Sequence, residues 1–295
     1  MEELAVAGFA EARRRAFPAH GWLGLGLALV FWCVNWLLPG PRTHWAFFPL
    51  WLGYCLSIDG LLLWRTGTSL LTRSPVRYGG LFLLSAPAWW LFEALNLVTR
   101  NWTYIGAEHL GPLEFASWTT LNFTTVMPAV FGAAELAASL PWLRRLPRGP
   151  SLAATPRTTL AFFAAGWLGL LLLVLWPRVF FPLIWISPLM ILEPINVWLG
   201  NRSLADWTGA GDWRPAVALW VGVLLTAFFW EMWNFHSFPK WIYSVPWGDA
   251  LHVFEMPLLG YGGYLPFSLE LFALYHFALG RRLGADPGFL RFAPD

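Results

Sequence analysis

Long runs of apolar residues constrain this chain more than any other feature of its sequence. A helix needs about 20 residues to cross the roughly 30 Å of hydrocarbon in a bilayer. Only 12% of the 295 residues are charged, against about 25% in a soluble domain, so we expect an integral membrane protein. Eight stretches approach the required length, near 22–39, 45–64, 80–98, 113–140, 159–176, 179–200, 215–233 and 249–279.

The apolar stretches are expected to be helices. An irregular chain cannot cross lipid, because its amide and carbonyl groups would lack hydrogen-bond partners. No stretch alternates apolar and polar residues in the way that the strands of a membrane barrel do. The sequence therefore predicts an all-α, polytopic integral membrane protein with about eight transmembrane helices.

The basic residues predict how the chain is oriented. With eight spans, fifteen Lys and Arg side chains fall on the side of the two termini and four fall on the opposite side. Positively charged residues favour the cytoplasmic side, so both termini are expected in the cytoplasm and the protein in the cytoplasmic (inner) membrane. We see no secretory signal ahead of the first span. The four residues on the opposite side are Arg42, Arg100, Arg178 and Lys240.

The sequence also contains an internal repeat. The stretch "FFPLWLGYCLSID" (47–59) resembles "FFPLIWISPLMILE" (180–193), and "WLFEALNLVTRNWTY" (90–104) resembles "FWEMWNFHSFPKWIY" (229–243). Matching positions are 133 to 141 residues apart. We predict two tandem four-helix repeats with the same orientation, related by a pseudo-two-fold axis along the membrane normal.

The repeat divides the chain into five segments. A basic, Pro-rich stretch separates the two predicted repeats, and short polar segments precede and follow them. The predicted divisions are a cytoplasmic N-terminal segment (1–21), a first membrane repeat (22–140), a cytoplasmic linker (141–158), a second membrane repeat (159–279) and a cytoplasmic tail (280–295).

Each predicted repeat carries four acids inside its spans or at their mouths. An ionisable side chain in a bilayer is costly and indicates a functional site by default. No Lys or Arg lies well inside a span, so we expect these carboxyls to be neutral or held by neutral donors. The acids are Asp59, Glu93, Glu114 and Glu135 in the first repeat and Glu193, Glu231, Glu255 and Glu270 in the second.

Four of these acids are expected to converge at one level of the membrane, namely Glu93, Glu114, Glu231 and Glu255. Neighbours three positions away on a helix share a face, which pairs Asn96, Asn234 and His252 with acids. The loops "NWTY" and "KWIY" carry aromatic residues that are expected to cap the cluster. The predicted orienting or substrate-binding residues are Asn96, Trp102, Tyr104, Asn234, Trp241, Tyr243, His252 and Glu270.

The order of these motifs resembles that in the repeated membrane domain of the heterodimeric and fungal-type lycopene cyclases. An acid near a span's end is followed by an aromatic-x-aromatic loop, by a glutamate that opens the next span, and by a later Pro and Glu. Residues 90–135 match best, with "PLEF" (112–115) where the family shows Pro-x-Glu-Glu. The second half offers "VFEM" (253–256).

The resemblance implies a redox-neutral cyclisation of a linear polyene end group. A protonated carboxyl can act as general acid towards a carbon–carbon double bond, and a second carboxylate can remove the final proton. Aromatic faces can stabilise the intermediate carbocation. The resemblance assigns the acid and base to the set Glu93, Glu114, Glu231 and Glu255, and the substrate would be a hydrophobic isoprenoid or carotenoid.

No cofactor, metal or nucleic-acid partner is expected. No Gly-x-Gly-x-x-Gly motif follows a strand, so the flavin-binding architecture of the other cyclase class is not predicted. The six histidines are scattered and the two cysteines, Cys33 and Cys55, lie in separate spans, whereas metal sites need clustered ligands. The expected partners are the lipid bilayer and the polyene.

Two other classes of protein stay open. The chain has 22 tryptophans, which also serve as interfacial anchors, and such a surface suits a non-enzymatic subunit that binds pigments or lipids in a homo-oligomer or a larger membrane complex. Paired intramembrane acids in a duplicated architecture also suit a proton or solute transporter. The direction in which the acids point distinguishes these alternatives.

Overall fold

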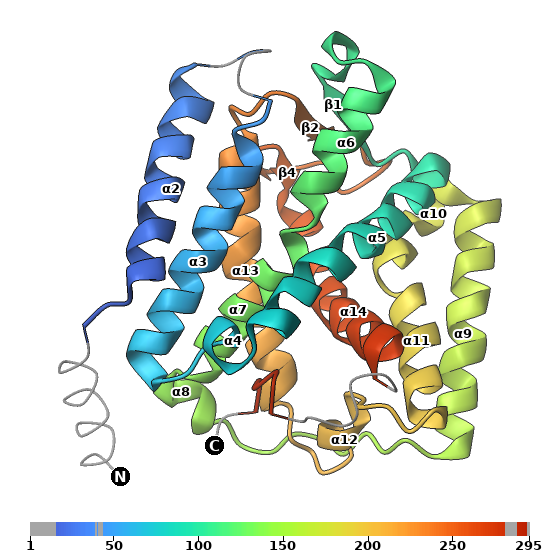
Figure 1. The fold of residues 1–295 in the computed structure, drawn as a ribbon. Helices are drawn as coiled ribbons and strands as arrows, with labels where there is room; N and C mark the ends of the chain where they lie inside the picture. Colours follow the sequence, from blue (N-terminus) through green and yellow to red (C-terminus); the bar gives the residue numbers. More distant parts are fainter. Residues whose placement is uncertain (1–15, 39, 41–43, 281–287, 294–295) are drawn as a thin grey trace.

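The computed structural model describes residues 16–38, 40, 44–280 and 288–293 (Figure 1). Most of the predicted N-terminal segment (1–21) and part of the predicted tail (280–295) lie outside the described residues. Among the basic residues behind the predicted orientation, Arg13, Arg14, Arg15, Arg42, Arg281 and Arg282 also lie outside them.

The chain is mostly helical, and seven of its described helical segments are long and apolar enough to cross a membrane. This agrees with a multi-pass helical membrane protein; the predicted count of eight is not confirmed. The seven are α2 (Ala19–Leu37), α3 (Phe47–Thr66), α5 (Pro75–Thr99), α6 with α7 (Pro112–Ala138), α9 (Pro156–Leu175), α10 with α11 (Pro177–Trp198) and α13 (Arg214–Asn234).

The segment predicted as an eighth span, 249–279, is helical only in its second part. The helix α14 (Tyr261–Leu279) begins after a short antiparallel hairpin of β3 (His252–Val253) and β4 (Met256–Pro257), followed by the 3₁₀ turn Leu258–Gly260. Phe254 in the hairpin turn has a positive φ of 58°, a conformation outside the helical region. Glu255 therefore lies in a turn and not in a span.

Two of the membrane segments are interrupted. Between α6 (Pro112–Phe123) and α7 (Val126–Ala138), the hydroxyls of Thr124 and Thr125 donate to backbone carbonyls three residues earlier, at 2.6 and 2.7 Å. Ser85 of α5 also donates to the Phe123 carbonyl and accepts from the Met127 amide. These bonds satisfy backbone groups that the break leaves free. In the second segment a 3₁₀ turn (Phe181–Trp185) separates α10 (Pro177–Phe180) from α11 (Ser187–Trp198).

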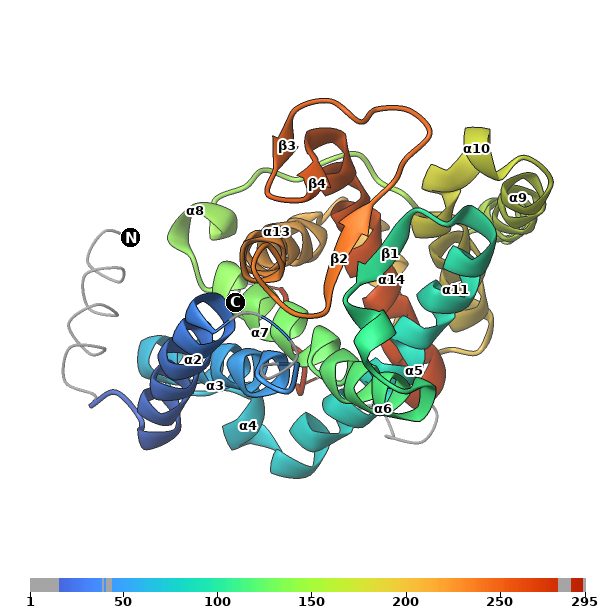
Figure 2. The same cartoon turned by 90° about the horizontal axis from the view of Figure 1, so that it is seen from above.

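The helices form two outer pairs around a central group. Helix α2 packs against α3, and α9 packs against α11, on opposite sides of the molecule (Figures 1 and 2). Between these pairs lie α7 and α13, which pack against each other, with α5 and α14 (Figure 2). Nearly every residue of α7 is buried. The strands β1 (Trp102–Ile105) and β2 (Lys240–Tyr243) lie together at one end of the molecule.

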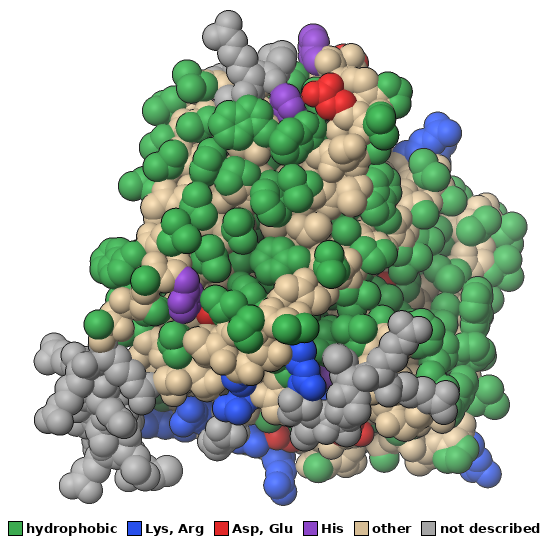
Figure 3. All heavy atoms as spheres, in the orientation of Figure 1, with side chains coloured by type: hydrophobic (Ala, Val, Ile, Leu, Met, Phe, Trp, Pro, Cys, Tyr) green, Lys and Arg blue, Asp and Glu red, His purple; other side chains and the backbone are tan. Residues whose placement is uncertain are grey.

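The opposite end carries short helices and most of the visible positive charge. These helices are α4 (Leu70–Arg73), α8 (Pro141–Arg144) and α12 (Ala205–Thr208). Figure 3 shows hydrophobic side chains over most of one face and Lys and Arg side chains mainly along this end. An apolar band with charges at its end fits a protein embedded in a bilayer.

Glycines allow the helices to approach closely. A Cβ built on Gly24 of α2 would lie 2.5 Å from the Ser57 amide of α3, and one on Gly53 would lie 2.5 Å from the Ala28 amide of α2. At the centre, a Cβ on Gly222 of α13 would lie 2.3 Å from the Ala134 amide of α7. Small residues at such crossings permit backbone contact between membrane helices.

We expect the substitution Gly24→Val to destabilise the protein by about 1–3 kcal/mol, because the added side chain meets backbone atoms that cannot yield. Gly26→Val, in the same helix, is the matched control, since nothing lies within 4 Å of a Cβ at Gly26. The measurement is the free energy of unfolding in detergent. Equal losses in the two variants would contradict the close-packing argument.

Candidate functional site: a pocket walled by aromatic side chains

A cavity lies beneath the strands β1 and β2. It measures about 110 Å³, far more than a single water molecule needs. Of its lining residues in the described chain, none is Lys or Arg. The aromatic and histidine residues that line it are His44, Phe47, Trp89, Trp102, Tyr104, Phe115, Trp118, Phe123, Trp185, Trp230, Phe238, Trp241, Tyr243 and Tyr264.

The pairing of β1 with β2 places the two aromatic-x-aromatic elements on one face. Trp102 lies opposite Tyr243, and Tyr104 lies opposite Trp241. Side chains two apart in a strand point the same way, and these four line the cavity whereas the intervening Thr103 does not. Thr103 itself pairs with Ile242, the residue at the matching position of the sequence repeat. The two strands are therefore related by a local two-fold axis.

The carboxylate of Glu93 lies directly behind this wall. One of its oxygens, Oε1, accepts hydrogen bonds from Trp89 Nε1 at 3.1 Å, Trp102 Nε1 at 3.0 Å and Tyr104 Oη at 2.6 Å. Trp89 and Glu93 are four residues apart and share one face of α5. All three donors line the cavity, so the carboxylate is separated from the cavity by one layer of aromatic side chains.

Glu231 has a similar arrangement in the second half. It is fully buried, and its Oε1 accepts from Tyr243 Oη at 2.8 Å and from Tyr264 Oη at 2.6 Å. Trp241 Nε1 donates to the Tyr243 hydroxyl at 2.9 Å. The second oxygen, Oε2, has no hydrogen-bond partner among the described residues.

The strand tyrosines stay protonated and act as donors. Removal from water raises the pKa of Tyr104 and of Tyr243 well above the ordinary value, and the neighbouring carboxylates Glu93 and Glu231 add to that rise. A neutral phenol donates one hydrogen bond. Each tyrosine therefore keeps its hydroxyl proton between a carboxylate and the cavity.

Two asparagines fix the loops that carry the strands. Asn96 donates from Nδ2 to the Trp102 carbonyl at 2.9 Å and accepts from the Asn101 amide at 2.8 Å. Asn234 donates to the Trp241 carbonyl at 2.7 Å and accepts from the Trp241 amide at 2.9 Å. Asn96 and Asn234 were expected to orient Glu93 and Glu231. Their side chains instead bind backbone groups of the loops.

Glu114 does not join Glu93 and Glu231. Its carboxylate, 49% exposed, lies 3.6 Å from His44 Nε2 at the first turn of α6. His44 lines the cavity but Glu114 does not.

Glu255 is held by an ion pair. It bonds to Lys240 Nζ across the loops. The expectation that the acids are neutral or held by neutral donors is therefore wrong for Glu255, and it is also wrong for Glu135, which pairs with Arg73. His252 contacts Asp249 at 3.0 Å; its predicted helical pairing with Glu255 is wrong because both residues lie in the β3–β4 hairpin.

Asp59 and Glu193 stabilise helix ends at the opposite end of the molecule. Asp59 accepts from the Leu71 amide in α4 at 3.0 Å. Glu193 accepts from the backbone amides of Leu204 and Ala205, where α12 begins. A carboxylate at a helix N-terminus satisfies free amide groups and favours the helix dipole, so both residues have a structural role.

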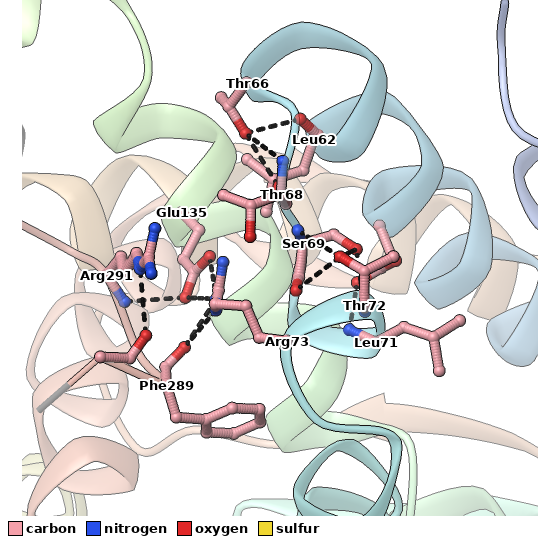
Figure 4. A network of polar contacts seen from close by, with 12 residues as sticks. Leu62, Thr66, Thr68, Ser69, Leu71, Thr72, Arg73, Glu135, Phe289 and Arg291 are labelled. Atoms are coloured by element: carbon pink, nitrogen blue, oxygen red, sulfur yellow. Dashed lines mark hydrogen bonds and ion pairs between the residues drawn. The ribbon is translucent and has the colours of Figure 1, made fainter. Parts of the chain in front are cut away.

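Glu135 and Glu270, which the predicted sequence repeat places at corresponding positions, differ in their partners. Both carboxylate oxygens of Glu135 accept a hydrogen bond from Arg73 Nη2 at 2.6 Å. Oε1 also accepts one from the Arg291 amide at 2.8 Å (Figure 4). Arg73 also donates to the Phe289 carbonyl, which fastens residues near the C-terminus to this site. Glu270 is fully buried, and neither oxygen has a hydrogen-bond partner among the described residues.

Several wall residues were not predicted from the sequence. Trp89, Trp185, Trp230, Tyr264 and His44 line the cavity. For Trp89 the sequence did contain a signal, because Trp89 lies four residues before Glu93 and so shares its helix face. The described residues contain no group of three His, Cys, Asp or Glu that could hold a metal ion.

No family model, no curated protein and no solved structure matches the chain.

We expect Asn234→Ala to destabilise the protein by about 1–3 kcal/mol for each backbone group of Trp241 that loses its partner. Hydrogen exchange at the Trp241 amide should accelerate together with the loss of stability. Asn122→Ala is the control, since Asn122 lines the cavity but its side-chain oxygen has no partner in the described chain. Unchanged exchange in Asn234→Ala would contradict the proposed role.

We expect Arg73→Met to cost about 3–5 kcal/mol, because it leaves the Glu135 carboxylate buried without its cation. The double variant Arg73→Met, Glu135→Met should recover most of that loss. A double-mutant cycle of unfolding free energies measures the coupling. Additive losses in the cycle would show that the pair makes no specific contribution.

Proposed function

We propose that this protein is a carotenoid (lycopene) cyclase-like membrane enzyme that cyclises a polyene end group without net oxidation or reduction. One observation carries the proposal: two carboxylates, Glu93 and Glu231, are hydrogen-bonded by neutral Tyr and Trp side chains that form the wall of an apolar cavity. The resemblance of 90–135 to the membrane domain of lycopene cyclases points to the same chemistry.

The hydrogen bonds suggest different roles for the two carboxylates. Glu93 accepts three hydrogen bonds on one oxygen from side chains that line the cavity, a geometry that suits a group accepting a proton. Glu231 is fully buried and one of its oxygens has no partner in the described chain, which suits a carboxyl that holds a proton. When Glu231 carries the proton on Oε1, its hydrogen bond with Tyr264 reverses, and the Tyr264 hydroxyl then donates into the cavity.

The proposed reaction balances without a cofactor. A proton from the Glu231–Tyr264 pair adds to the terminal double bond and leaves a tertiary carbocation. An internal double bond then attacks that carbon and forms the ring. Loss of a proton towards Tyr104 and Glu93 restores a double bond, so the product is an isomer of the substrate. Aromatic faces around the cavity would stabilise the cation by about 0.5–2 kcal/mol each.

The four predicted catalytic acids are thereby reduced to two. Glu114 is half exposed outside the cavity wall, and Glu255 is neutralised by Lys240. We propose supporting roles for them, Glu114 through His44 at the cavity and Glu255 through its ion pair beside Glu231. Both act through another residue and not on the substrate.

We also infer that the chain consists of two tandem four-helix repeats with cytoplasmic termini. The matching carboxylate, asparagine and aromatic networks support this, as do the two-fold pairing of β1 with β2 and the helix-capping acids Asp59 and Glu193. The concentration of Lys and Arg at the end opposite the strands (Figure 3) supports the orientation.

A subunit that binds a pigment or a lipid is the second candidate, because a cavity lined by aromatic side chains also suits a protein that binds such a molecule without converting it. A transporter has less support. Three of the acids at the end opposite the strands, Asp59, Glu193 and Glu135, are held by backbone amides or by arginine and do not line the cavity.

The test is to express the chain in a bacterium that accumulates lycopene and to separate the extracted pigments. The wild-type protein should yield cyclic carotenoids. Glu231→Gln and Glu93→Gln should each lower the yield by about 100-fold or more, as expected for loss of a general acid or base.

Glu108→Gln is the matched control, because Glu108 is 67% exposed on the loop after β1, and it should keep wild-type yield. Unchanged lycopene, with the protein verified in the membrane, would reject the cyclase proposal in favour of the subunit. Cyclic products from both active-site variants would reject the assignment of the two carboxylates.

A further inference from the structure

We propose that the aromatic cavity is a binding site for an organic cation, specifically an alkylated ammonium group with an apolar substituent. This goes beyond the proposed cyclisation, because it requires no turnover and no polyene.

The first argument is a contrast between the acids. Glu135 is paired with Arg73 and Glu255 with Lys240, so their negative charge is compensated. Among the described residues, Glu93 and Glu231 accept hydrogen bonds from neutral Trp and Tyr side chains alone. No Lys or Arg of the described chain lines the cavity between them. The Glu93 carboxylate, which the proposed reaction leaves without a proton, therefore has no Lys or Arg of the described chain at the cavity to compensate it.

The second argument is the composition of the wall. Trp102 stacks on Trp185 with ring centroids 6.0 Å apart, and Trp230 stacks on Tyr264 at 6.1 Å. These rings come from β1, the 3₁₀ turn before α11, α13 and α14. Aromatic faces carry negative potential and attract a cation that has lost its water. All four rings line the cavity, so its wall offers aromatic surface from four elements.

The third argument concerns which cations fit. A metal ion needs direct contact with its oxygen ligands, and here a layer of Trp and Tyr donors separates both carboxylates from the cavity. An alkylated ammonium holds little water and binds to ring faces without such contact. The apolar lining residues Leu110, Val126 and Met256 suit its carbon substituent.

Such a cation has two sources, a lipid headgroup or a free amphiphile. A choline headgroup brings a phosphate, which the uncompensated Glu93 carboxylate disfavours. The charge on the wall therefore favours a free alkylammonium cation over phosphocholine.

The test uses wild-type protein in a deuterated maltoside detergent and four probes. Choline and 3,3-dimethylbutan-1-ol have the same shape but differ in charge, hexyltrimethylammonium adds an apolar chain, and phosphocholine adds the phosphate. Each carries a nine-proton singlet whose NMR line broadening gives a dissociation constant. Choline should bind about tenfold more tightly than its neutral isostere, a difference of about 1.4 kcal/mol, and hexyltrimethylammonium more tightly still.

If wild-type protein binds choline and 3,3-dimethylbutan-1-ol equally well, the proposal is wrong. This comparison requires no variant. Tighter binding of phosphocholine than of choline would keep the cation site and assign it to a lipid headgroup. Glu93→Gln should weaken hexyltrimethylammonium binding about tenfold while leaving the neutral isostere unaffected, and Glu108→Gln should change neither. Because no pigment is measured, the cation site and the proposed cyclisation can fail separately.

Discussion

Hydrogen bonds from tryptophan and tyrosine to two carboxylates hold together the end of the molecule that contains the cavity. Glu93 joins α5 to β1 through Trp102 and Tyr104, and Glu231 joins α13 to β2 and α14 through Tyr243 and Tyr264. A buried carboxylate without partners costs several kcal/mol. The aromatic donors offset that cost, and their rings at the same time form the cavity wall.

The same residue types serve different purposes at the two ends of the membrane segments. At the end opposite the strands, Asp59 and Glu193 hold short helices, and Glu135 is neutralised by Arg73. At that end these carboxylates are bonded to backbone amides or to a guanidinium. At the cavity, Glu93 and Glu231 are bonded by Trp and Tyr side chains that also line an open space.

The multi-pass helical architecture could be predicted because the length of an apolar stretch is a local property of the sequence. The loop residues Trp102, Tyr104, Trp241 and Tyr243 were correctly expected near Glu93 and Glu231, since each follows its acid within a few residues. Contacts between distant segments could not be read in this way. Arg73 reaches Glu135 across 62 residues, and Tyr264 reaches Glu231 from another helix. The hairpin β3–β4 replaced a predicted helical turn because Leu251 and Phe254 adopt positive φ angles, which no periodicity indicates.

The ladder between β1 and β2 has a mechanical consequence. The strands belong to loops about 139 residues apart in sequence, and each is fastened to its own helix by an asparagine. A force that lifts one loop away from the membrane is therefore transmitted through the ladder to the other loop and its helix. The paired strands β1 and β2 cover the cavity. A molecule that enters between the two loops must therefore displace both of them together, and the alternative route is sideways between the helices.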